Sequence, residues 1–183
     1  NGYRIVCAGS CVENTESPYA VCKTNLKNAL SIITKYDLSY AWGRIFYPYG
    51  IYEKQERLIS YIINSLLQNN KTLCTDGEQI RDLMYVEDVA SAFVTLLDND
   101  AEGEFNICSG NPVKLKNVIE LIGDKLDKKD LINFGALKHR KNEIMEIKGC
   151  PNRLKKELKW TPKYSLNEGL DKTIEWERRY LEK

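Results

Sequence analysis

Apolar residues in the first part of this chain form two short runs separated by a helical stripe. The runs Tyr3 to Ala8 and Leu38 to Phe46 are rich in β-branched and aromatic residues, and they predict buried strands. Between them, Pro18 to Lys35 is predicted to be a helix that covers the sheet and is long enough to serve an interface, with an apolar stripe of Cys22, Leu26, Ala29, Leu30 and Ile33. Strand, helix and strand in this order predict a parallel unit with its functional edge at the carboxyl ends of the strands.

The rest of the chain continues to alternate between helical and strand patterns. Helical spacing predicts helices at Arg57 to Gln68, Val86 to Leu97 and Lys116 to Leu126. Glu104 to Cys108 is predicted to be another strand, and a capping box at Ser165 predicts the start of a final helix. In the helix from Val86, the residues expected to face inward are Val89, Ala90, Phe93, Val94 and Leu97.

Composition indicates an ordinary soluble domain. The chain has 183 residues, of which 43% are hydrophobic and 29% charged, and its net charge is +1. This balance offers no general field for nucleic acid or a membrane surface. No apolar run approaches ~20 residues and no signal peptide opens the printed residues.

The six cysteines are scattered without a C-x-x-C pair, which indicates reduced thiols rather than disulfides, so we expect a cytoplasmic protein. The single histidine, His139, lies between Lys138 and Arg140, and this setting makes a zinc site improbable. No metal is therefore expected. Cys11 is the one thiol close to candidate chemistry, and for it we favour a packing role over reactivity.

The segment SPYAVCK, from Ser17 to Lys23, holds the candidate chemistry. Tyr19 and Lys23 are one helical turn apart and share a helix face, while Ser17 and Pro18 suit the helix start. An ammonium beside a phenol favours phenolate and lowers a pKa that starts near ~10. The spacing of Tyr19 and Lys23 alone is weak support for a proton-transfer site, because a chain rich in tyrosine and lysine contains such pairs by chance. Ser10, just past the first strand run, is well placed to hydrogen-bond a substrate oxygen.

These motifs, in their order, resemble the extended short-chain dehydrogenases/reductases that act on nucleotide sugars, the NAD-dependent epimerase/dehydratase family. Ser10 in AGSC matches the family's active-site Ser/Thr, and Tyr19 and Lys23 match its Tyr-x-x-x-Lys pair. The resemblance covers nearly the whole chain, because further motifs follow in the family's order: RIFYPYG, RLISYII, DGEQIRDLMYVEDVA, GEFNICSG and LKKELKWTP.

The resemblance implies a set of catalytic and cofactor-binding roles. Tyr19 would be the general acid/base, Lys23 would bind the nicotinamide ribose and lower the pKa of Tyr19, and Ser10 would hold the reacting oxygen. Tyr19, Lys23 and Phe46 would form the cofactor side of the site. The implied cofactor is NAD or NADP, with hydride exchanged between the nicotinamide and a sugar carbon.

The resemblance also implies a nucleotide-sugar substrate and residues that bind it. Arg81 is the strongest candidate for the diphosphate, because a guanidinium fork suits such oxygens. Arg140 and Arg57 are further phosphate candidates, each as consistent with a solvated arginine, and Tyr47 lies in the turn leading to the sugar-nucleotide site. The family further implies a homodimer built with the helix that begins at Pro18.

Three residues are expected to be structural rather than chemical. Asp82 is interpreted as orienting Arg81, and Asp88 as orienting a helix start. Lys159 stands where the family usually has glycine, a departure that affects a turn.

The predicted fold class is α/β, a partial Rossmann domain with a doubly wound parallel sheet and a smaller α/β substrate-binding lobe. No G-x-x-G-x-x-G turn occurs, so we expect that the segment holding most of the cofactor site precedes the printed residues. Residues 1–50 and 83–109 are assigned to the Rossmann part, and residues 51–82 and 110–183 to the lobe.

The connection between Ser10 and Tyr19 is short. Eight residues separate them, where the resemblance implies a much longer loop. Either the gene has lost this loop or the printed sequence omits residues of it, and we favour the second reading. If the loop is truly short, Ser10 is less well placed to reach the substrate of Tyr19.

The residues after Ser10 limit which of the family's reactions this chain is expected to catalyse. Within the family, eliminating water across the sugar needs an acidic pair there, and this chain has Cys11 and Val12. We therefore expect a 4-ketosugar reductase or a 4-epimerase, and favour the reductase because AGSCVE resembles a GSxxEY form of the motif. The alternative is a non-catalytic nucleotide-binding or scaffold member of the fold, which the coding sequence upstream of Asn1 would distinguish.

Overall fold

The computed structural model describes residues 3–13, 15–33 and 38–182. Its main sheet is fully parallel and has the strand order β1-β2-β7. These strands are β1 (Tyr3–Ser10), β2 (Leu38–Ile45) and β7 (Gly103–Ile107). The predicted parallel unit is confirmed, and the carboxyl ends of all three strands lie at one edge.

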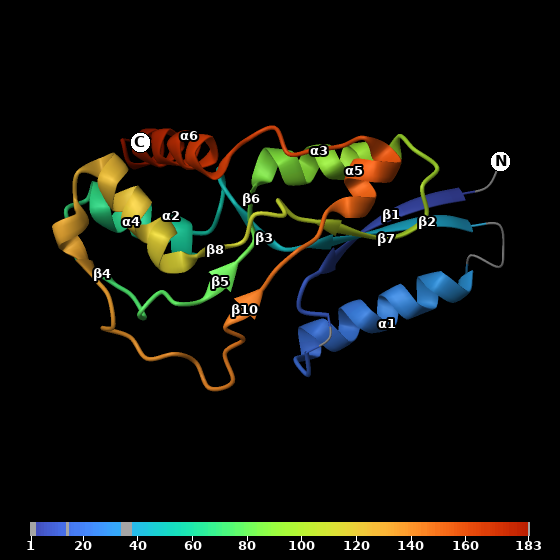
Figure 1. Ribbon diagram of the computed structural model, residues 1–183, viewed down its shortest axis with the longest axis horizontal. Coiled ribbons are helices and arrows are strands. Elements are labelled where there is room, and N and C mark those ends of the chain that lie inside the picture. Colours follow the sequence, from blue (N-terminus) through green and yellow to red (C-terminus); the bar gives the residue numbers. More distant parts are fainter. Residues whose placement is uncertain (1–2, 14, 34–37, 183) are drawn as a thin grey trace.

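Helices cover both faces of this sheet. Helix α1 (Pro18–Ile33) lies on one face, and α3 (Val86–Leu97) and α5 (Asn152–Leu158) lie on the other (Figure 1). This is the arrangement of a doubly wound sheet, as predicted. The core between the sheet and the α3 side is formed by Ala41, Met84, Val89, Ala92, Leu96, Phe105, Ile107, Leu154 and Trp160.

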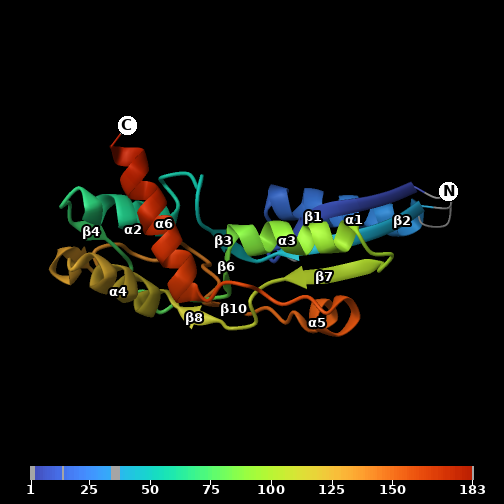
Figure 2. The ribbon, with the colours of Figure 1, turned by 90° about the horizontal axis from the view of Figure 1, so that it is seen from above.

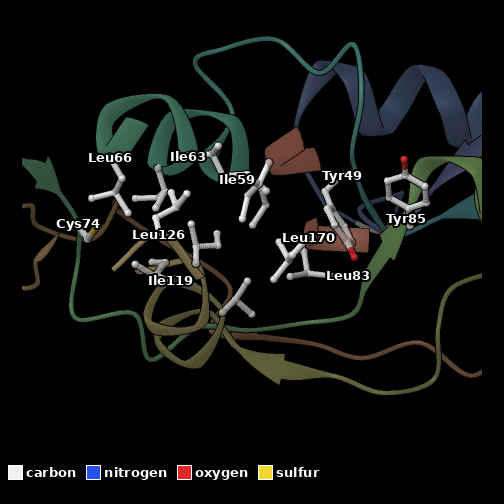
Figure 3. Packing of buried hydrophobic residues seen from close by; sticks show 14 residues of the cluster. Tyr49, Ile59, Ile63, Leu66, Cys74, Leu83, Tyr85, Ile119, Leu126 and Leu170 are labelled. Atoms are coloured by element: carbon white, nitrogen blue, oxygen red, sulfur yellow. The ribbon is translucent and has the colours of Figure 1, made fainter. Parts of the chain in front are cut away.

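The other helices form a separate group beside the sheet. These are α2 (Leu58–Leu67), α4 (Leu115–Leu126) and α6 (Leu166–Leu181), and α6 crosses α2 in the view of Figure 2. Aliphatic side chains from all three helices interdigitate in one core (Figure 3). The best-buried members of that core are Ile62, Ile63, Leu66, Ile122 and Leu170.

Short strands connect and border the two groups. The parallel pair β3 (Tyr47–Tyr49) and β6 (Leu83–Tyr85) runs between them. A second small sheet contains β10 (Glu146–Ile147), β5 (Ile80–Arg81) and β8 (Val113–Lys114). A third pairs β4 (Thr72–Leu73) with β9 (Ile132–Asn133), next to the 3-10 helix Lys129–Leu131. The assigned domain ranges stay a prediction, and α5, from the range assigned to the lobe, packs against β7.

Two predicted apolar faces are correct only in part. In α1 the expected stripe points largely outward, with Leu26 48% exposed, and the buried positions are Ala20 and Leu30. The side chain of Ile33, which belongs to the same stripe, lies outside the described part of the chain. In α3, Val89 and Phe93 pack inward as expected, whereas Ala90, Val94 and Leu97 are exposed. The other buried positions of this helix are Asp88, Ala92 and Leu96.

Strand β1 was expected to be buried, and this is also wrong. Only Gly9 is buried along it, because β1 lies at the edge of the described sheet with β2 as its single partner. The exposed positions include Tyr3, which is 81% exposed.

The two aspartates are structural, although not as expected. Asp82 does not orient Arg81. Its carboxylate accepts hydrogen bonds from the backbone N–H groups of Ser109 and Gly110 (2.8 and 3.0 Å), which fixes the turn after β7. Asp88 likewise accepts from the N–H groups of Lys163 and Tyr164, so it holds the segment that leads into α6.

Two local predictions are confirmed. Ser165 and Glu168 form the capping box of α6, with the Ser165 hydroxyl accepting from the Glu168 N–H. Lys159 has a φ of 55°, the left-handed conformation at the end of α5 where the family's glycine was expected.

Other features of the described residues bear on partners. All six cysteines are free thiols. No group of three or more His, Cys, Asp or Glu side chains gathers as a metal site in the described ranges. Within the same ranges, no helix combines the length and apolar character needed to span a bilayer.

Candidate active site at the carboxyl edge of the parallel sheet

The ends of three strands bring Ser10, Cys11 and Phe46 to one edge. Ser10 is the last residue of β1 and pairs in register with Ile45 of β2. The Cys11 N–H donates to the Ile45 carbonyl at 2.8 Å, and the Phe46 N–H donates to the Ile107 carbonyl at 3.2 Å. The sheet therefore places the predicted serine beside the turn that begins at Phe46.

The first turn of α1 lies against the same end of β1. Its start is capped by Ser17, whose hydroxyl accepts from the Ala20 N–H at 3.2 Å. Lys23 donates from Nζ to the Ala8 carbonyl at 2.7 Å, and its Nζ lies 5.8 Å from the centre of the Tyr19 ring. Tyr19 is 56% exposed. Lys23 thus ties the helix to the strand two residues before Ser10, while the Tyr19 phenol stays accessible.

A buried carboxylate supports the turn after Ser10. Glu13 is 3% exposed, and its Oε1 accepts hydrogen bonds from the Ser10 N–H and from Trp42 Nε1, each at 2.7 Å. Its Oε2 faces Arg44 at 3.4 Å and Lys27 at 3.5 Å. Burial opposes ionisation, but these donors and charges outweigh it and hold the pKa of Glu13 below its usual range.

The neighbouring thiol and phenol are unsuited to proton transfer near neutral pH. Burial raises the pKa of Cys11 to about 11, which favours the packing role expected for it. Burial likewise raises the pKa of Tyr47, whose ring lies 5.2 Å from the Arg81 guanidinium. Tyr19 is therefore the phenol at this edge that remains open to a reactant.

Arg81 lies beneath the segment that follows Arg140. Its guanidinium donates to the carbonyl of Ile144 at 2.7 Å and to that of Met145 at 3.2 Å. The Glu143 carboxylate lies 3.5 Å away, and the Arg81 side chain is 7% exposed. Arg81 anchors the 143–145 segment next to Tyr47, and its role as a phosphate ligand stays a prediction.

The same segment is held from its other side by polar contacts. His139 Nε2 lies 3.0 Å from Asp76, and Gln79 Nε2 lies 3.3 Å from both His139 and Glu143. Hydrogen bonding to Asp76 raises the pKa of His139. The Arg140 N–H donates to Glu143 Oε2 at 3.3 Å, while Arg140 itself is exposed. This leaves the Arg140 side chain accessible above an anchored backbone.

Arg57 lies at the start of α2. It precedes α2 as the N-cap residue, and its side chain is 60% exposed and lies 3.7 Å from Glu53. Its charge lowers the pKa of Tyr47 against the stronger effect of burial. Arg57 thus faces the same region as Tyr47 without being buried there.

Two site residues were missed from the sequence. Glu13 follows Ser10 by three positions and Glu143 follows Arg140 by three, and in each case the carboxylate binds a backbone N–H of the earlier residue. The sequence signal for both was an acidic residue three positions after a candidate functional residue, a spacing at which a carboxylate can accept the earlier backbone N–H. The pairing of Glu143 with Arg81, however, spans 62 positions and has no local signature.

Comparison with known proteins decides the family. The model of the "NAD dependent epimerase/dehydratase family" matches residues 7–108, which is more than half of the chain. The chain belongs to this family. The family expected from the ordered motifs is therefore confirmed, and with it the α/β fold class.

Curated relatives in this family are named for reactions on nucleotide sugars. The chain is 30% identical over 146 residues to CDP-abequose synthase of Salmonella typhimurium, covering 76% of the chain and 48% of the relative. It is 34% identical over 139 residues to dTDP-4-dehydro-6-deoxyglucose reductase of Escherichia coli, covering 72% of the chain and 42% of that protein. The chain thus spans about half the length of the curated relatives that it matches.

Solved structures show the same fold. The dTDP-glucose 4,6-dehydratase of Bacillus anthracis, solved in complex with NAD, has a TM-score of 0.87 and 26% identity, and the match covers 98% of this chain and 63% of that one. The UDP-glucose 4-epimerase of Thermotoga maritima, solved with UDP-glucose, has a TM-score of 0.88 at 22% identity, covering 97% of this chain and 64% of that one.

The described residues fit one half of a nicotinamide dinucleotide. An accessible phenol (Tyr19) and an ammonium (Lys23) lie at the carboxyl edge of a parallel sheet, where such cofactors bind in Rossmann folds. The printed sequence holds no glycine-rich turn for the pyrophosphate.

Proposed function

We propose that this chain is the catalytic and substrate-binding part of an NAD(P)-dependent nucleotide-sugar 4-ketosugar reductase. A 4-epimerase is the second candidate, because it needs the same acid/base and the same hydride exchange. The relatives named as a synthase and a reductase of deoxysugar nucleotides support the first choice.

The single observation that carries this proposal is the inward orientation of Glu13. It is the carboxyl nearest in sequence after Ser10, and it is buried and bonded to Trp42 and the Ser10 N–H. Its lowered pKa keeps it ionised, so it has no proton to give to a leaving hydroxyl. With Cys11 protonated and Val12 apolar, the turn lacks the acid and base that a dehydratase needs.

The remaining groups suffice for reduction of a ketone. Ser10 would hold the sugar oxygen, and Tyr19 would give it a proton as the carbonyl is reduced. Lys23, fixed to Ala8, would stabilise the phenolate left on Tyr19 and position the cofactor ribose. The bound nicotinamide supplies the hydride. An epimerase would use the same groups twice. It would first oxidise the sugar hydroxyl to a ketone and would then reduce that ketone from its opposite face, which inverts the carbon.

Product analysis with the full-length protein tests this assignment. A nucleotide 4-keto-6-deoxyhexose with NADH or NADPH should give the 4-hydroxy sugar with one reduced cofactor consumed per product. A 4-epimerase would instead interconvert nucleotide hexoses without net use of cofactor. Release of a 4-keto-6-deoxy product from a nucleotide hexose would refute both, and binding without turnover would identify the non-catalytic alternative.

Tyr47, Arg57, Arg81 and Arg140 are the proposed substrate-binding residues. Arg140→Ala is expected to weaken binding of the nucleotide sugar about tenfold or more, because an exposed guanidinium that meets a phosphate contributes roughly 1.5–3 kcal/mol. Calorimetric titration with the nucleotide sugar measures this. Lys138→Ala, also exposed on this segment, should leave the affinity nearly unchanged. Equal losses in the two variants would show a general charge effect and no specific contact.

A homodimer is proposed from the outward apolar face of α1. Val21, Leu26 and Ile32 are 46%, 48% and 58% exposed, an arrangement that suits a second copy of the same helix. Light scattering of the full-length protein should give twice the chain mass, and Leu26→Asp should give the monomer mass. A monomeric wild-type protein would contradict the proposal.

A further inference from the structure

The loop of residues 138–144 carries one of the proposed phosphate ligands. In the described part of the chain, backbone hydrogen bonds join this loop to other segments only at its two ends. Before it, the Leu137 N–H donates to the Cys74 carbonyl at 3.0 Å, and after it the Ile80 N–H donates to the Met145 carbonyl at 2.7 Å. Between these two points the position of the loop depends on side chains.

Two side chains of the loop, His139 and Glu143, are partly buried, whereas the others are exposed. His139 Nε2 lies 3.0 Å from Asp76 Oδ1, and its Nδ1 lies 3.6 Å from Glu143 Oε2. Gln79 Nε2 lies 3.3 Å from both His139 Nδ1 and Glu143 Oε1. The imidazole therefore lies between two carboxylates and joins the loop to residues 76–79.

Glu143 contacts both arginines that are proposed to bind the substrate phosphates. Its Oε2 accepts from the Arg140 N–H at 3.3 Å, and its Oε1 lies 3.5 Å from the Arg81 guanidinium. The same guanidinium donates to the loop carbonyl of Ile144 at 2.7 Å. A change in how His139 holds Glu143 therefore changes how the loop holds the backbone of Arg140.

The charges around His139 favour its protonated form. Hydrogen bonding to Asp76 raises the pKa of His139 against a smaller opposing effect of desolvation. The carboxylates that face the imidazole are Asp76 and Glu143. Of the cations farther out, Lys116 lies beside the turn after Asp76, and Arg81 lies against Glu143. The imidazolium is thus the cation that faces both carboxylates, and its charge is lost as the pH rises through its pKa.

We propose that His139 is a positioning residue that holds this loop in place for substrate binding. Its imidazolium bridges Asp76 and Glu143, and through Glu143 it fixes the backbone of Arg140. The inference rests on the proposed function, in which Arg140 and Arg81 meet the diphosphate of a nucleotide sugar. It concerns affinity and not the chemical step, because the proposed acid/base lies on α1.

Calorimetric titration and steady-state kinetics of the full-length protein at about pH 6 test this role. His139→Ala should weaken binding of the nucleotide sugar about three- to tenfold and raise KM, while kcat changes less than about twofold. Adding His139→Ala to Arg140→Ala should cost little further affinity, because the two residues act as one unit. Full affinity in Arg140→Ala would refute the substrate role of Arg140 and this inference with it. Full affinity in His139→Ala, with a loss in Arg140→Ala, would refute this inference alone.

Amide hydrogen exchange tests the holding role without substrate. The amides of residues 138–144 should exchange faster in His139→Ala than in the wild type, whether or not Arg140 meets a phosphate. Unchanged exchange in this loop would contradict the holding role even if the affinity fell.

The affinity should also depend on pH in one direction. The wild type should bind the nucleotide sugar more tightly at about pH 6 than at about pH 9, because the imidazolium is lost above a pKa raised from ~6.5. His139→Gln keeps a hydrogen-bond donor but cannot change its charge, so this difference should disappear. A pH dependence that persists unchanged in His139→Gln would overturn the proposal.

The matched control is Lys114→Ala. It breaks another ion pair to the segment before β5, because Lys114 Nζ lies 2.7 Å from Glu78, and these two side chains are 47% and 46% exposed. Its affinity, loop exchange and pH dependence should equal those of the wild type. Equal losses in Lys114→Ala and His139→Ala would show a general charge effect and would refute a specific role for His139.

Discussion

Tyr19→Phe is expected to lower kcat about 10²- to 10⁴-fold while the nucleotide sugar still binds with nearly the same affinity. The change removes the exposed phenol oxygen of Tyr19 at the carboxyl edge of the sheet and leaves the ring in place. Tyr19 is 56% exposed and is held near Lys23, so losing its hydroxyl should not disturb the fold. Single-turnover kinetics and calorimetric titration of the full-length protein separate the two effects.

The matched control for this variant is Tyr180→Phe, which removes a hydroxyl from a 53% exposed tyrosine on α6. Its turnover should equal that of the wild type. Undiminished turnover in Tyr19→Phe would refute the acid/base role, while a parallel loss of binding would indicate a positioning role for the hydroxyl.

Glu13→Ala is expected to reduce the free energy of unfolding by about 3–5 kcal/mol. It would leave the buried Trp42 indole N–H and the Ser10 N–H without their acceptor, and Arg44 and Lys27 would keep only the half-exposed Glu104 as a carboxylate partner. Because Glu13 fixes the Ser10 backbone, turnover should also fall. Urea unfolding at neutral pH measures the first effect, and the remaining folded protein can be assayed for the second.

Glu104→Ala is the control, because Glu104 pairs with the same Lys27 and Arg44 but its side chain is 40% exposed. Its cost should be below about 1 kcal/mol. A similar cost for both variants would contradict the account of Glu13.

The pH dependence follows from the lowered pKa of Glu13. Its stabilising contribution is present above the unfolded pKa of about 4.3 and is lost as the pH falls through the lower pKa of the folded state.

The parallel unit and the helix boundaries were predictable because they depend on local patterns. Alternation of apolar runs and helical stripes placed β1, β2 and α3 within one or two residues of their observed bounds. The capping box at Ser165 and the turn at Lys159 are also local features, and the structure has both. The order of several motifs along the chain also identified the family, which the spacing of Tyr19 and Lys23 alone could not have done.

The orientation of two helices was not predictable from apolar stripes, because polar side chains decide it. In α1, Lys23 and Lys27 turn toward the sheet and reach Ala8 and Glu13 with their long stems. In α3, Asp88 turns inward to accept the N–H groups of Lys163 and Tyr164, which brings Ala92 and Leu96 to the core face one and two turns later.

The candidate site was predictable only where it is local. Ser10, Tyr19 and Lys23 were proposed from a motif, and the structure brings the ends of their elements together. The anchoring of Arg81 by the 143–145 segment depends on residues more than 60 positions apart and needs the tertiary structure.

The most direct test of the proposed function is transfer of deuterium from 4-deuterated NADH or NADPH to a nucleotide 4-keto-6-deoxyhexose by the full-length protein. We expect NMR of the product to show deuterium at C4 of the sugar in a single configuration, and Tyr19→Phe to slow its appearance. Deuterium at another carbon, or a substrate that binds tightly and gains none, would contradict the assignment of this chain as a 4-ketosugar reductase.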